Sequence, residues 1–72
     1  MTTNEYKAAC QDVAILLFDA LNGPERFAKI YANMVVEAIA NIADQSGFDA
    51  ENVHDDVVWY EHLYEETIEQ EA

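Results

Sequence analysis

Two histidines lie among carboxylates at spacings that could bind a metal ion. Glu51 and His54 form a Glu-x-x-His pair, which would place a carboxylate and an imidazole on one face of a helix. A second group further along the chain comprises His62, Glu65 and Glu66. Because 15 of the 72 residues are acidic, such pairings also arise by chance. We therefore expect no metal site and no cofactor.

The sequence offers no catalytic nucleophile paired with a base. The single cysteine, Cys10, lies with Ala9 and Val13 among apolar residues at helical spacing, and it is expected to pack as a small apolar residue. Neither histidine is close to it in sequence. The two glycines stand apart and form no phosphate-binding loop. The chain is therefore not expected to be an enzyme.

The charge of the chain excludes several classes of partner. Fifteen acids against three basic residues give a formal net charge of -12. Direct nucleic-acid binding requires a basic surface, and anionic membranes repel such a chain. The longest apolar run, Val13 to Phe18, is far shorter than the roughly 20 residues of a membrane span. With one cysteine and no signal-peptide pattern at the N-terminus, the protein is expected to be cytoplasmic.

Apolar periodicity predicts an all-α fold, a small three-helix bundle. Thr2 and Glu5 have the spacing of a capping box before the first apolar stripe. Gly23 is expected to take a left-handed conformation after the first helix, Pro24 to begin the second, and Gly47 to end it. One domain, residues 1–72, should therefore contain helices at about 3–21, 24–45 and 50–70.

The first two helices carry more apolar residues than one core face can use. Ile15, Leu16 and Phe18 lie beyond the main stripe of the first helix. The second helix has two apolar rows, one of Phe27, Tyr31, Met34 and Ala38 and one of Ile30, Val35, Ile39 and Ile42. This surplus predicts a symmetric homodimer. The alternative is a central helix that is covered on all sides.

The third helix combines an apolar stripe with unfavourable charges. The stripe comprises Val53, Val57, Tyr60, Leu63, Tyr64 and Ile68. Asp55 and Asp56 suit the positive end of the helix dipole. In contrast, Glu61 with Glu65, and Glu65 with Glu69, place like charges one turn apart, at a cost of about 0.2–0.5 kcal/mol per pair. These acids are either a solvated face or a surface for a cationic partner.

We favour the second interpretation. The chain would dock on the basic surface of a protein that binds nucleic acid and inhibit it, with Trp59 stacking on an arginine unless it closes the core. In its general character the chain resembles small acidic helical phage proteins that occupy the nucleic-acid grooves of restriction and CRISPR enzymes. The alternatives are a structural or adaptor subunit that assembles through apolar helix faces, and a metal-binding helical bundle. The candidate partner-binding residues are Asp55, Asp56, Trp59, Glu61, His62, Glu65, Glu66 and Glu69.

Overall fold

The protein folds into three helices joined by short turns. The structure, a computed structural model, describes residues 1–71 and the side chains of residues 1–69. The helices are α1 (Thr3–Asn22), α2 (Glu25–Ser46) and α3 (Ala50–Glu71), and residues 1–71 contain no strand. The predicted all-α three-helix fold is confirmed, and each helix begins and ends within one residue of its predicted range.

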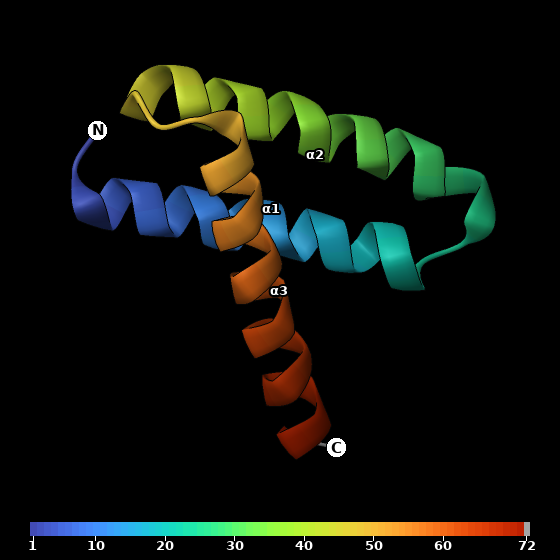
Figure 1. Cartoon of the computed structure of the whole chain (residues 1–72). Helices are drawn as coiled ribbons and strands as arrows, with labels where there is room; N and C mark the ends of the chain where they lie inside the picture. The colour runs from blue at the N-terminus through green and yellow to red at the C-terminus, as the bar shows by residue number, and fades with distance from the viewer. Residues whose placement is uncertain (72) are drawn as a thin grey trace.

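The central helix is α1, which contacts both of the others, whereas α2 and α3 contact each other less. Figure 1 shows α1 and α2 side by side and antiparallel, with α3 crossing them at a steep angle. The last turn of α3 extends past α1. The molecule is thin, with extents of 35 × 28 × 16 Å. No helix in residues 1–71 combines the length and apolar character needed to cross a bilayer.

Local signals fix the ends of the helices. The Thr2 hydroxyl accepts a hydrogen bond from the Glu5 N–H at 3.1 Å, and the Thr2 N–H donates to the Glu5 carboxylate at 3.1 Å. The predicted capping box is therefore confirmed. These two hydrogen bonds satisfy backbone donors that the first turn of a helix would otherwise leave unpaired.

The two glycines end helices for different reasons. Gly47 has φ of 79°, the left-handed conformation that glycine adopts without strain. Gly23 is extended, with φ of -85° and ψ of -177°, so the predicted left-handed exit is wrong there. Its N–H bonds to the Asp19 carbonyl, and a Cβ at position 23 would lie 2.6 Å from that oxygen. Glycine is required at position 23 because the backbone approaches too closely for a side chain.

The core is small and lies where α1 meets its two neighbours. It comprises Cys10, Val13, Ala14, Val35, Ile39, Ile42, Val53 and Val57. On α3 the first residues of the predicted apolar stripe, Val53 and Val57, are fully buried, whereas Leu63 and Ile68 are exposed. Leu63 lines a surface pocket with Ile15 of α1. On α2, Phe27, Ile30 and Met34 are exposed, so this helix is not covered on all sides.

We predict that Gly23→Ala will lower the free energy of unfolding by about 1–3 kcal/mol, because the added methyl group forces the Asp19 carbonyl to move. Gly47→Asn should cost less, since asparagine tolerates the left-handed conformation and open space surrounds position 47. Thermal unfolding followed by circular dichroism compares the two variants. Equal stability of Gly23→Ala and the parent chain would contradict the close approach.

Candidate functional site

One face of α3 presents a continuous row of exposed functional side chains. Its members follow one another at steps of four, three, four and three residues, which places them on a single side of a helix. We call this row the outer stripe of α3; it comprises Asp55, Trp59, His62, Glu66 and Glu69, all exposed. At 1.5 Å per residue the stripe spans about 21 Å.

The packing of α3 on α1 explains why this face is the outer one. Val53 and Val57 are fully buried against the core and lie on the side of α3 opposite the stripe. Burying these two valines therefore turns Asp55 and Trp59 toward solvent. The burial of the apolar side fixes the rotation of α3 about its axis, and this rotation makes the charged side face solvent.

Trp59 is the largest side chain of the stripe, and 58% of its surface is exposed. Its ring meets the edge of Tyr60 with the ring centroids 5.0 Å apart, in a T-shaped pair. Tyr60 itself is half-buried and packs against the core. Trp59 therefore does not close the core. It is an exposed ring held in place from one side.

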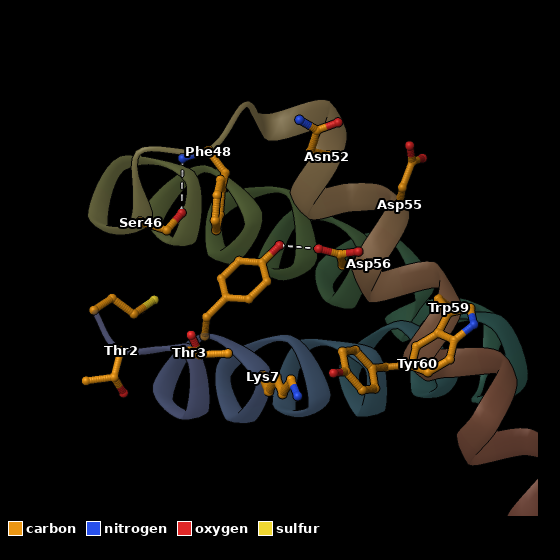
Figure 2. Close-up of a pocket in the computed structure, with 12 residues that line it drawn as sticks. Thr2, Thr3, Lys7, Ser46, Phe48, Asn52, Asp55, Asp56, Trp59 and Tyr60 are labelled. Atoms are coloured by element: carbon orange, nitrogen blue, oxygen red, sulfur yellow. Dashed lines mark hydrogen bonds between the residues drawn. The ribbon is translucent and has the colours of Figure 1, made fainter.

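A groove of about 720 Å³ adjoins the stripe at Trp59. It lies between the start of α1, the turn after α2 and the first half of α3, and Figure 2 shows the side chains that line it. Four of them are aromatic: Tyr6, Phe48, Trp59 and Tyr60. The sequence did not predict this groove, because its walls come from three separate segments that meet only in the fold.

A hydrogen bond inside the groove joins α1 to α3. The Tyr6 hydroxyl donates to the Asp56 carboxylate, and the Tyr6 ring meets Phe48 edge-on with the ring centroids 5.1 Å apart. Burial, together with the bond to Asp56, raises the pKa of Tyr6 above its usual range, so the phenol keeps its proton. Asp56 thus has a partner within the chain, and it lies off the outer stripe.

Cys10 is fully buried beside Tyr6, as its spacing predicted. Burial raises the pKa of its thiol, and the Asp56 carboxylate adds to this, while a hydrogen bond with Tyr6 acts in the opposite direction. The thiol therefore stays neutral near pH 7, whereas nucleophilic chemistry requires the thiolate.

Glu61 lies inside the fold, unlike the other acids grouped with it in the sequence prediction. Only 3% of its surface is exposed, and its Oε1 atom has no hydrogen-bond partner. Glu61 follows Val57 by four residues, as Val57 follows Val53, so it continues the buried row of α3. That spacing was the signal for its burial. Desolvation raises the pKa of Glu61, and the neighbouring Glu65 carboxylate raises it further.

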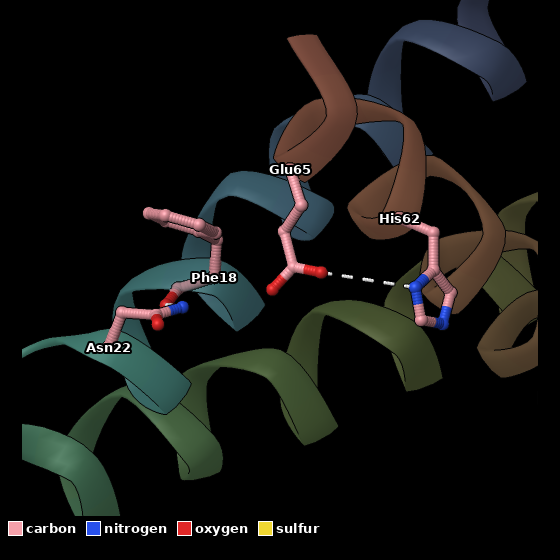
Figure 3. Close-up of polar contacts among 4 residues, drawn as sticks. All are labelled: Phe18, Asn22, His62 and Glu65. Atoms are coloured by element: carbon pink, nitrogen blue, oxygen red, sulfur yellow. Dashed lines mark hydrogen bonds and ion pairs between the residues drawn. The ribbon is translucent and has the colours of Figure 1, made fainter. Parts of the chain in front are cut away.

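The two histidines differ in their surroundings. His62 Nδ1 lies 3.9 Å from a Glu65 carboxylate oxygen, and Figure 3 shows the two side chains pointing toward each other. His54 Nδ1 lies 3.8 Å from Asp55. In residues 1–69, the one group of three possible metal ligands is Glu61, His62 and Glu65. The Glu51–His54 pair does not belong to such a group.

Most of the negative charge has no cationic partner within the chain. Throughout residues 1–69, no lysine or arginine nitrogen lies within 4.0 Å of a carboxylate oxygen, and the two charge contacts there involve histidine. The Arg26 guanidinium instead lies over the Phe27 ring, 4.8 Å from its centroid. The carboxylates of the outer stripe are therefore free to meet cations from outside.

The structure thus sorts the eight predicted residues into three environments. Five form the outer stripe, Asp56 lies in the groove, and Glu61 with the half-buried Glu65 lies beside the stripe.

Comparisons of the chain with protein-family models, curated proteins and solved structures found no match. Function is therefore inferred from the geometry.

Glu61→Leu should stabilise the fold at pH 7 by about 1–3 kcal/mol, because it removes a buried carboxylate oxygen without a partner. Since the pKa of Glu61 is raised in the folded state, its protonated form favours folding. That contribution is complete below the unfolded-state pKa and is lost as the pH rises through the folded-state pKa.

The stability difference between Glu61→Leu and the parent chain should therefore widen as the pH rises. Urea unfolding at a series of pH values measures it. Glu66→Leu, at an exposed acid, is the matched control and should show no such widening. A Glu61→Leu variant that is less stable than the parent at pH 7 would contradict the assignment of an unpaired buried carboxylate.

Proposed function

We propose that this chain is a small acidic binding protein that docks the outer stripe of α3 on a basic surface of a protein that binds nucleic acid, and thereby inhibits that protein. One observation carries the proposal: exposed carboxylates without a lysine or arginine partner share a helix face with an exposed tryptophan. The charges supply attraction at a distance, and the ring supplies an anchor at contact.

Electrostatics favours such docking over a purely solvated face. Glu66 and Glu69 lie one turn apart near the carboxyl end of α3, where both their mutual repulsion and the helix dipole oppose them. A cationic partner removes this repulsion when it binds. The same partner can place an arginine over Trp59, since guanidinium groups stack favourably on indole rings.

Proteins that bind nucleic acid fit the charge requirement best. Their binding surfaces gather lysine and arginine to neutralise phosphates, and a row of fixed carboxylates can occupy the same surface. On this proposal the chain and a nucleic acid compete for one site. The blocked partner loses its nucleic acid without any chemical step.

We expect simultaneous substitution of Asp55, Glu66 and Glu69 by lysine to abolish docking. Pull-downs from host lysate with the parent chain should recover a basic protein at about 50 mM salt and lose most of it at about 300 mM, because salt screens charge attraction. Added duplex DNA should displace that protein. The fluorescence of Trp59, the one tryptophan of the chain, should change when the purified partner is added.

A matched control is the triple substitution of Asp12, Asp19 and Glu37 by lysine. These acids are exposed on α1 and α2, so the control changes net charge equally but leaves α3 intact. It should retain capture, whereas Trp59→Ala should weaken it. Equal loss in both triple variants would contradict docking through the stripe and would indicate attraction by total charge alone.

A second candidate function, assembly through apolar faces, has a separate observation in its favour. Phe27, Ile30 and Met34 form an exposed apolar face on α2, which we call the α2 apolar face. The chain exposes 5147 Å², compared with about 4,500 Å² for a compact monomer of its mass. The excess surface is suited to a second copy of the chain, in a symmetric homodimer.

Ile30→Asp should shift this assembly toward the monomer, since it places a charge at the centre of the α2 apolar face. Ile30 is 56% exposed, so the fold should tolerate the change. Val36→Asp is the control, because Val36 is 66% exposed and lies on another side of α2. Sedimentation velocity measures the mass of both variants. A parent chain that sediments as a monomer at high concentration would exclude this candidate.

A further inference from the structure

The buried carboxylate of Glu61 requires a physical explanation. Almost none of its surface is exposed, and Oε1 is both inaccessible and without a hydrogen-bond partner. A buried carboxylate is costly unless it is paired or bound to a metal ion. No lysine or arginine nitrogen in residues 1–69 lies within 4.0 Å of it. A bound cation would supply the partner that Oε1 lacks within these residues.

Two further metal-ligating side chains lie beside Glu61. One carboxylate oxygen of Glu61, one imidazole nitrogen of His62 and one carboxylate oxygen of Glu65 all lie within 4.8 Å of one another. Positions 61 and 65 are neighbours across one helical turn, and His62 reaches Glu65 from three residues away. Three ligand atoms from one helix thus converge on the same space.

We propose that Glu61, His62 and Glu65 form a binding site for a first-row divalent cation of the zinc class. A zinc ion with ligands at about 2.1 Å in tetrahedral geometry needs its ligand atoms roughly 3.4 Å apart. The present spacing of up to 4.8 Å is wider. Rotation of the exposed His62 and half-exposed Glu65 side chains can close it toward the fixed oxygen of Glu61.

The ligand types select the metal. An imidazole nitrogen with two carboxylates suits zinc and its neighbours in the first transition row, whereas calcium and magnesium prefer oxygen ligands and six or more of them. Three protein ligands leave a fourth position for water or for a group on a partner. Glu61 and Glu65 lie off the outer stripe and His62 belongs to it, so the two proposed sites share one side chain. Zinc binding to the isolated chain requires no docking partner, so it can be tested separately.

Isothermal titration of the metal-free full chain with zinc chloride tests the site. We expect one zinc ion per chain, with Glu61→Gln and His62→Gln each weakening binding by about tenfold or more. Glu37→Gln removes an exposed acid of α2, away from the three ligands, and should leave the affinity unchanged. Cobalt in place of zinc should give the visible absorption of a four-coordinate ion in the parent chain but not in His62→Gln.

His62→Gln keeps the test decisive if Glu61→Gln alters the fold, because the His62 side chain is 68% exposed. Circular dichroism checks that each variant is helical. Absence of saturable zinc binding by the parent chain would overturn the proposal. So would equal weakening by Glu37→Gln, or calcium binding as tight as zinc binding, since both results indicate only general attraction of cations to an acidic chain.

Discussion

The crossing of α3 over α1 is the contact from which the other features of the molecule follow. Small side chains on α1, Cys10 and Ala14, let the two helices approach closely, and Val53 and Val57 fill the contact from α3. This packing fixes the rotation of α3 about its own axis. It therefore decides which acids face solvent, which ring is exposed and which carboxylate is buried. Loss of the crossing would remove both proposed sites together.

Within residues 1–69, the negative charge has no lysine or arginine partner. A core of eight residues leaves little stability in reserve, yet Glu61 is buried and like charges follow one another along α3. Both features lower the stability of the isolated chain, and the two proposed sites would each relieve one of them by binding a cation. Proteins commonly retain such unfavourable groups where they bind something. The acidic face and the buried carboxylate are thus related consequences of one excess of negative charge.

Features that depend on local sequence were predictable, and features that depend on helix crossing were not. The capping box at Thr2, the left-handed Gly47 and the three helices follow from signals within a few residues. The aromatic groove requires Tyr6, Phe48 and Trp59 to meet, and no local pattern specifies that. The sequence contained a signal for the burial of Glu61, because Glu61 follows Val57 by four residues and so continues the buried row. Its charge suggested a solvated position instead. The partial exposure of Leu63 depends on how α3 crosses α1, since Leu63 lines a surface pocket with Ile15 of α1.

The last turn of α3 extends past the α1 and α2 pair (Figure 1). A single helix is only about 10–12 Å wide with its side chains, which is close to the width of the major groove of duplex DNA. A cleft about as wide as one helix therefore admits the end of α3 but excludes a pair of packed helices, whose axes lie about 8–10 Å apart. The width of the end of α3 thus sets the narrowest cleft that this part of the molecule can enter, independently of its charge.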